Sequence, residues 1–258
     1  MSYVTIEKQR YYFRLNEGAQ KNDDAMVFIH GSGGDGSVWE YQLSEPGRQH
    51  PVIIPDLPGH GNSEGSLLST AKEYAQWLDR AVDSLKLSSF ILVGHSMGGA
   101  IAQEYARCYP EKVTGLILAG TGIHFQIQEE YRRILYTSFE TAVRTSCDHA
   151  YTFPASQELY KKGYEMLMRN GKKTLTSDLE VCEHFDSSNW IKSIRQKTLV
   201  VCGKDDRITP CTLSEELSSA MPYSELSIIS EAGHMAMMEA PLRFNSALKN
   251  FIKKGVSP

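Results

Sequence analysis

The sequence has few cysteines and no long apolar run. Its 258 residues contain five scattered cysteines, and no two of them form a CxxC pair. This pattern favours neither a zinc site nor a disulfide framework. No segment approaches the roughly 18–20 consecutive apolar residues of a membrane-spanning helix, and the first residues, MSYVTIEKQR, lack the apolar stretch of a signal peptide. We therefore expect a cytoplasmic protein without a membrane span.

An excess of positive charge is also missing. There are 27 Lys and Arg against 31 Asp and Glu, giving a net charge of −4, so we expect no nucleic-acid partner. The histidines are scattered and no HExxH motif occurs, so we expect neither a metal site nor a cofactor. Hydrophobic residues make up 41% and charged residues 22%, which is ordinary globular usage.

Short apolar runs alternate with helical patterns along most of the chain. Runs that are apolar at every position and bounded by turns are typical of strands buried on both faces. The alternation predicts an α/β fold, a mostly parallel central sheet with helices on both faces. The alternating segment 3–15 predicts an antiparallel hairpin at one edge. The predicted strands cover 26–30, 52–56, 90–94, 116–119, 199–202 and 226–229, and the helical patterns cover 71–85, 97–109, 212–219 and 241–252.

One stretch interrupts this alternation. Residues 124–195 show only helical patterns, such as IQEEYRRILY and SQELYKKGYEMLMRN. Helices inserted between two buried strands, here after strand 6, would pack as a lid over the sheet. We therefore predict a core formed by residues 1–123 and 196–258 and a helical cap formed by residues 124–195.

The strongest chemical signal is the segment GHSMGG, residues 94–99. It forms a G-x-S-x-G pattern directly after the strand FILV and directly before a helical pattern. A serine on so sharp a strand-to-helix turn needs glycine two positions away on either side, because other side chains would make the strand and helix collide. The context predicts that Ser96 is a nucleophile.

A serine hydroxyl needs a base, and the base needs an acid to orient it. His234 is the candidate base, in the loop between the last predicted strand and the last helix. Asp205 and Asp206 compete as the acid, since both follow the strand LVVC at the edge where open α/β sheets bind ligands. The order serine, aspartate, histidine agrees with a nucleophile elbow of this kind.

Acyl transfer also requires hydrogen-bond donors for the oxyanion, each worth about 3–4 kcal/mol. The backbone N–H of Met97 is one candidate because it follows the nucleophile. The second candidate lies in HGSGG, residues 30–34, where we favour the N–H of Ser32 and keep Gly33 as the alternative. This turn lacks the Lys-Ser/Thr ending of a phosphate-binding P-loop.

Together these motifs resemble those of the α/β-hydrolase fold superfamily, specifically its single-domain, lidded serine hydrolases. The resemblance covers almost the whole chain and is loosest in the lid. It implies that the acid is the fourth residue of GKDD, which favours Asp206 over Asp205. The matching segments are HGSG (30–33), DLPGHGNS (56–63), GHSMGG (94–99), GKDD (203–206) and GH (233–234).

The function predicted from these residues is hydrolysis of carboxylic esters of small to medium, largely apolar substrates through an acyl-enzyme. The chain would act on small molecules as a monomer or homodimer. The residues expected at the substrate pocket are Gly31, Gly33, His95, His124, Phe125 and Met235.

Three alternatives stay open. The first is a hydrolase that cleaves carbon–carbon bonds in ring-fission products. Its relatives commonly carry Asn before the nucleophile and Trp after the catalytic histidine, whereas this chain has His95 and Met235. The second is another activity of the same three residues, as in a lactonase, a thioesterase or a monoacylglycerol lipase. The third is a non-catalytic ligand-binding or signalling protein on the hydrolase scaffold.

Overall fold

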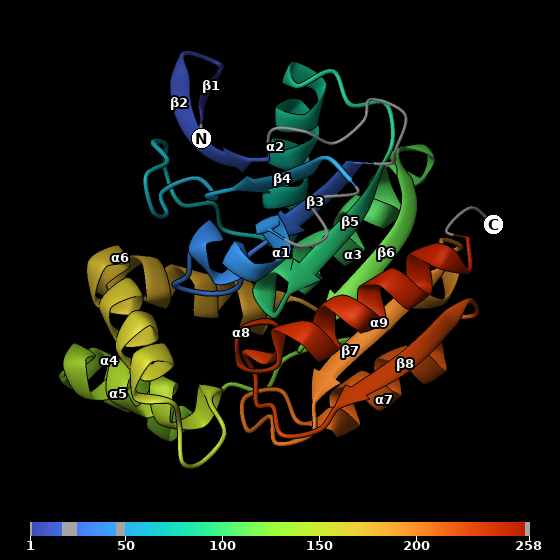
Figure 1. Cartoon of the computed structure of the whole chain (residues 1–258). Helices are drawn as coiled ribbons and strands as arrows, with labels where there is room; N and C mark the ends of the chain where they lie inside the picture. The colour runs from blue at the N-terminus through green and yellow to red at the C-terminus, as the bar shows by residue number, and fades with distance from the viewer. Residues whose placement is uncertain (1, 17–24, 45–49, 256–258) are drawn as a thin grey trace.

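A computed structural model describes residues 2–16, 25–44 and 50–255, and within them one eight-stranded sheet forms the centre of the molecule (Figure 1). The strand order is β1-β2-β4-β3-β5-β6-β7-β8. The β1–β2 and β2–β4 pairs are antiparallel, and the remaining pairs are parallel. The predicted fold class and N-terminal edge hairpin are therefore confirmed. The strands are β1 Ser2–Ile6, β2 Gln9–Leu15, β3 Ala25–Ile29, β4 Val52–Pro55, β5 Phe90–His95, β6 Val113–Ala119, β7 Thr198–Gly203 and β8 Ser224–Ile229.

Helices cover both faces of the sheet. Alternate residues of a strand point to opposite faces, so a strand that is apolar at every position packs against helices on both. In β5, Leu92 packs in the cluster that contains Ile101 of α3, whereas Val93 packs in the cluster that contains Phe244 of α9. Figure 1 shows α9 in front of the sheet and α3 behind it. The core helices are α1 Glu40–Ser44, α2 Ala71–Ser84, α3 Met97–Cys108, α7 Cys211–Ala220, α8 Ala236–Glu239 and α9 Pro241–Lys253.

One strand differs from the expectation of burial on both faces. β8 is the last strand of the sheet, and Leu226 and Ile228 are 36% and 46% exposed. Leu226 and Ile228 are two positions apart and so point to the same face, which remains partly in solvent at this end of the sheet. Local sequence does not distinguish such a strand from a central one.

Three further α-helices lie between β6 and β7 in the chain. They are α4 Glu129–Thr137, α5 Phe139–Ala150 and α6 Gln157–His184. They lie together on one side of the sheet (Figure 1). α6 is kinked at Gly171, whose φ of 87° is left-handed. The helical insertion after β6 agrees with the predicted cap, while its boundaries at residues 124 and 195 stay a prediction.

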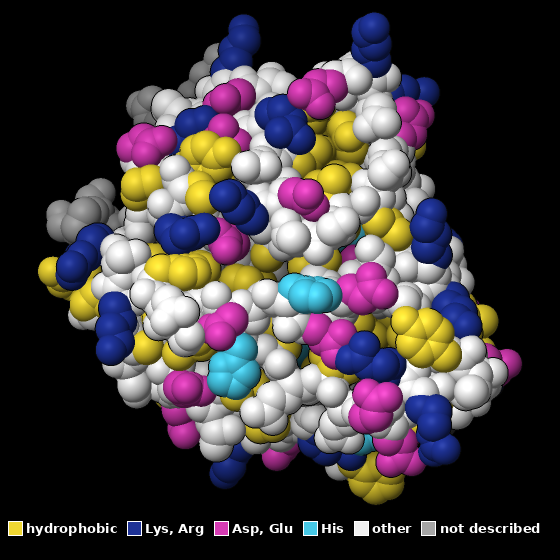
Figure 2. Space-filling model, turned by 180° about the vertical axis from the view of Figure 1, so that it is seen from behind, with side chains coloured by type: hydrophobic (Ala, Val, Ile, Leu, Met, Phe, Trp, Pro, Cys, Tyr) yellow, Lys and Arg dark blue, Asp and Glu magenta, His cyan; other side chains and the backbone are white. Residues whose placement is uncertain are grey.

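One face of the molecule shows mixed charge. The face in Figure 2 carries basic and acidic side chains interspersed. None of the helices within the described ranges has both the length and the hydrophobicity to cross a bilayer.

Candidate active site

Ser96 occupies a strained turn between β5 and α3. Its φ of 55° and ψ of −120° lie in a region that non-glycine residues rarely adopt. The flanking glycines make this turn possible. A Cβ on Gly94 would lie 2.2 Å from the carbonyl oxygen of Gly98, and a Cβ on Gly98 would lie 2.5 Å from that of Ile29. The backbone geometry thus has the form that the G-x-S-x-G pattern predicts.

Asp206 and His234 lie in contact beyond the ends of β7 and β8. Nδ1 of His234 donates a hydrogen bond of 2.8 Å to Oδ2 of Asp206. Thr209 Oγ1 donates to the same carboxylate oxygen at 2.8 Å and lies 3.0 Å from Nδ1 of His234. Because the Thr209 proton is directed to Asp206, the hydroxyl accepts from Nδ1 and the imidazole proton is shared between two acceptors.

The two aspartates that follow β7 have different surroundings. Asp206 is 5% exposed, and its Oδ1 accepts the backbone N–H groups of Ile208 and Thr209 at 2.8 Å. Burial by itself raises the pKa of Asp206, but His234 and the hydrogen bonds from Thr209 outweigh it and lower that pKa below its ordinary value. Asp205 is exposed to solvent. The structure therefore places Asp206, and not Asp205, against the imidazole.

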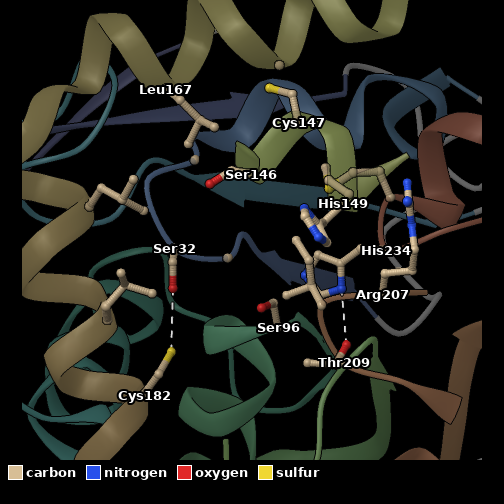
Figure 3. A pocket seen from close by; sticks show the side chains of 18 of the residues that line it. Ser32, Ser96, Ser146, Cys147, His149, Leu167, Cys182, Arg207, Thr209 and His234 are labelled. Carbon is tan, nitrogen blue, oxygen red and sulfur yellow. Dashed lines mark hydrogen bonds between the residues drawn. The ribbon is translucent and has the colours of Figure 1, made fainter. Parts of the chain in front are cut away.

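Ser96 and His234 line one pocket of about 230 Å³ between the core and the cap helices. In Figure 3, Ser96 is seen between Ser32 and His234. Within the described part of the chain, the Ser96 hydroxyl makes no hydrogen bond to the imidazole. Such contacts often tighten only when substrate is bound.

The loop after β3 lies against Ser96, since a Cβ on Gly31 would be 2.9 Å from the Cβ of Ser96. The carbonyl of Gly31 accepts hydrogen bonds from His30 Nδ1 at 3.0 Å and from the N–H of Gly34 at 3.1 Å. That carbonyl and the N–H of Ser32 belong to the same trans peptide and point in opposite directions. The hydrogen bonds that hold the carbonyl therefore also fix the direction of the N–H. Met97 is the first residue of α3, where N–H groups have no acceptor within the helix.

Gly33, the alternative donor, is engaged elsewhere. Its N–H donates to Oδ2 of Asp178 at 2.6 Å, on the cap helix α6. This leaves Ser32 as the candidate from this loop.

Comparison with known proteins shows the family of this chain. Residues 24–241 match the model of the alpha/beta hydrolase fold. The chain belongs to the α/β-hydrolase fold family. It is 26% identical to the "Putative carbamate hydrolase RutD" of Cronobacter turicensis over 248 residues, covering 91% of this chain and 93% of that protein.

Two further hydrolases are similar along almost their whole length. One is the 2-hydroxy-6-oxo-6-phenylhexa-2,4-dienoate hydrolase of Burkholderia cepacia, 27% identical over 275 residues, covering 98% of this chain and 96% of that protein. The other is the structure of a thermophilic esterase from Thermogutta terrifontis, 25% identical with a TM-score of 0.89, covering all of both chains. Family and relatives identify the chain as a hydrolase.

Two buried histidines of this hydrolase support the loops around Ser96. His30 donates from Nδ1 to Gly31, and its Nε2 accepts the N–H of Leu57 at 3.1 Å, which fixes a neutral tautomer. Burial, and then the nearby His60, lower its pKa to about 4. His95 lies against the His234 ring and donates from Nε2 to the His234 carbonyl at 3.0 Å. Burial and the neighbouring His234 lower the pKa of His95 well below its ordinary value.

Four of the six residues expected at the substrate pocket line it: Gly31, His95, Phe125 and Met235. His124 and Gly33 are not among the residues that line this pocket. His124 forms an isolated β-bridge with Asp186, one residue before Phe125 of the pocket wall. Gly33 has a left-handed φ of 64°, and its backbone N–H is bonded to Asp178 of α6.

Sequence reasoning missed several residues of this region. Thr209 supports both Asp206 and His234, and a hydroxyl three residues after an aspartate in a turn is a signal that could have found it. Cys182, with Sγ 3.5 Å from Ser32 Oγ, and Arg207 line the pocket without any local signal. Within the described ranges, no cluster of three His, Cys, Asp or Glu side chains could hold a metal ion.

Proposed function

We propose that this hydrolase cleaves carboxylic esters through an acyl-enzyme formed on Ser96. His234 takes the proton of the Ser96 hydroxyl as the oxygen attacks the ester carbonyl, then gives that proton to the leaving alcohol. Asp206 holds the imidazole with Nδ1 protonated and offsets the positive charge that develops on it. His234 then deprotonates water, which attacks the acyl carbonyl, and the bond to Ser96 breaks as His234 returns that proton to the Ser96 oxygen, releasing the acid.

The observation that carries this proposal is the contact between Asp206 and His234. A buried carboxylate bonded to Nδ1 leaves Nε2 as the basic nitrogen of the imidazole, and His234 lines the same pocket as the strained Ser96. The N–H groups of Ser32 and Met97 would bind the oxyanion. Preorganised donors of this kind stabilise charge that appears only in the transition state.

The pocket favours a substrate with an apolar acyl group. Cap and core side chains without charge form one part of its wall: Val38, Phe125, Ile127, Leu167, Leu175 and Leu179. An aliphatic or aromatic acyl chain would displace water from this wall, which is favourable by about 25 cal/mol per Å² of apolar surface. The similarity to an esterase of Thermogutta terrifontis supports an ester as the substrate.

A second candidate is cleavage of carbon–carbon bonds, which the similarity to the Burkholderia cepacia dienoate hydrolase favours. The same serine, histidine and aspartate can serve such a reaction. We prefer ester hydrolysis because His95 and Met235 stand where relatives of that kind commonly carry Asn and Trp. A ring-fission dienoate assayed beside esters and lactones separates these activities.

The test is turnover of p-nitrophenyl acetate by the wild-type chain, by Ser96→Ala and by Ser219→Ala. Ser219 is an exposed serine on α7 and serves as the matched control. We expect Ser96→Ala to lose at least about 10³-fold in kcat and Ser219→Ala to match the wild type. Wild-type activity in Ser96→Ala would refute the nucleophile. A folded wild type inactive towards every ester, lactone and dienoate would favour the ligand-binding alternative.

A further inference from the structure

A buried carboxylate of the cap reaches into the core beside the candidate oxyanion site. Asp178, in the second half of α6, has no exposed surface. Its Oδ2 accepts the N–H of Gly33 at 2.6 Å and lies 2.8 Å from Nε2 of His60. One oxygen atom of the cap therefore contacts two loops of the core, the one after β3 and the one after β4.

The contact with His60 requires a shared proton. Nδ1 of His60 lies 2.9 Å from the carbonyl oxygen of Pro58, which can only accept, so Nδ1 carries a hydrogen. A second proton must then lie between Nε2 and Asp178. Burial by itself lowers the pKa of His60, but the Asp178 carboxylate outweighs it and raises that pKa above the ordinary value. His60 and Asp178 thus form a buried, proton-sharing pair.

Stability alone does not account for this pair. The second oxygen, Oδ1 of Asp178, is buried and has no hydrogen-bond partner. A buried ion pair with an unsatisfied oxygen commonly contributes less to the free energy of unfolding than apolar side chains of the same volume do. The position of the carboxylate therefore calls for another explanation.

The same helix also holds the other side of the loop. Nδ2 of Asn170 donates to the carbonyl oxygens of Gly33 and Gly34, both at 2.9 Å. The N–H and the carbonyl of Gly33 are therefore both bonded to side chains of α6. On the preceding peptide, His30 fixes the carbonyl of Gly31. The N–H of Ser32 therefore lies between two held groups, the carbonyl of Gly31 and the N–H of Gly33.

We propose that Asp178 is a positioning residue that holds the oxyanion loop in its working geometry from the cap. The inference rests on the proposed function, because it assigns Ser32 to the oxyanion. Asp178 acts through Gly33 and does not touch substrate. Its pairing with His60 keeps the carboxylate directed at the Gly33 N–H, since the imidazole binds the same oxygen. The cap thereby contributes to catalysis as well as to the pocket wall.

The first test is steady-state hydrolysis of p-nitrophenyl acetate by Asp178→Asn and Asp178→Ala. A displaced oxyanion donor stabilises the transition state less but hardly changes the affinity for substrate. We therefore expect kcat to fall about 10–100-fold while KM changes less than about twofold. Asparagine retains an oxygen that can accept from Gly33, so Asp178→Asn should keep more activity than Asp178→Ala. Wild-type kcat in both variants would overturn the proposal.

Two controls separate positioning from attachment of the cap. Arg169→Ala removes the 2.6 Å ion pair between α6 and Asp35 but leaves the bonds to Gly33 in place. Glu180→Gln removes an exposed charge two residues from Asp178 on the same helix. We expect both controls to keep wild-type kcat. If Arg169→Ala lowers kcat as much as Asp178→Asn does, the effect belongs to cap attachment and the proposal fails.

A second measurement is the affinity for a boronic acid that forms a tetrahedral adduct with the serine. For Asp178→Asn it should weaken by about the same factor as kcat, and an unchanged affinity would count against positioning. Ser96→Ala in the same assays keeps the two hypotheses apart. Retained turnover in Ser96→Ala overturns the proposed function, whereas an inactive Ser96→Ala beside fully active Asp178 variants overturns only the role of Asp178.

Discussion

Thr209 donates a hydrogen bond of 2.8 Å to the carboxylate of Asp206, three residues before it in the chain. The backbone N–H of Thr209 binds the other oxygen of that carboxylate, also at 2.8 Å. Asp206 is therefore held by its own turn as well as by His234. A carboxylate fixed in this way keeps the imidazole ring in one orientation, which the proposed proton transfer requires.

We expect Thr209→Val to lower kcat for p-nitrophenyl acetate about tenfold. Valine has the shape of threonine but removes one hydrogen bond to Asp206 and one to His234, so the ring would be less firmly oriented. Steady-state kinetics measure the change. Thr212→Val, at an exposed position on α7, is the matched control and should leave kcat unchanged. Equal kcat in both variants would show that Thr209 does not support the ring.

Asp206→Asn should reduce kcat by several orders of magnitude without unfolding the chain. An amide can present its NH₂ group to Nδ1 and so stabilise the wrong tautomer of His234, an effect of about 10⁴-fold in a serine protease. Asp205→Asn changes an exposed carboxylate next to it and should have little effect. Kinetics with circular dichroism of both variants make the comparison, and the reverse ranking would transfer the role to Asp205.

Shortening an apolar side chain of the cap should change the acyl preference. Leu179 of α6 lines the pocket, so Leu179→Ala would enlarge its apolar part. We expect the ratio of kcat/KM for p-nitrophenyl octanoate to that for the acetate to rise about fourfold, the value of one methylene group. Leu242→Ala, at a side chain 77% exposed on α9, is the control. An unchanged ratio in Leu179→Ala would place the acyl chain elsewhere.

Stability should fall between neutral and mildly acidic pH. The native pKa of His30 is about 4 against an ordinary 6.5, so between these values the unfolded chain binds a proton that the native chain does not. The free energy of unfolding therefore decreases as pH falls through this window. His60, whose pKa is raised, acts oppositely and favours the native state until pH rises above its ordinary value.

Urea unfolding at pH 7 and pH 4.5 measures this effect. Glutamine at position 30 offers a hydrogen-bond donor and an acceptor but does not titrate. Between pH 7 and pH 4.5, His30→Gln should therefore lose less free energy of unfolding than the wild type, by on the order of 2 kcal/mol. Identical losses in wild type and variant would mean that His30 is protonated in the native state.

The sequence predicted the central strands well because they are local features. The run 90–94 lies within β5, and the helical pattern 97–109 agrees with α3 to within one residue. Apolar runs and their turn residues lie within a few positions of each other, so neighbouring residues suffice to define them. The exposure of β8 was mispredicted because it depends on what packs over the face that carries Leu226 and Ile228, which local sequence does not encode.

The sequence alone determined the strand–turn–helix context of Ser96 and the chain order of Ser96, an aspartate at 205 or 206, and His234. These follow from local backbone sterics and from the rule that residues after parallel strands meet at one edge of the sheet. Only the tertiary structure decided what surrounds them. The pair of His60 and Asp178 joins residues 118 positions apart, and an aspartate on an amphipathic helix carries no local mark of its partner. The pocket wall depends likewise on how α5 and α6 pack over the core, because contacts between distant segments form only on folding.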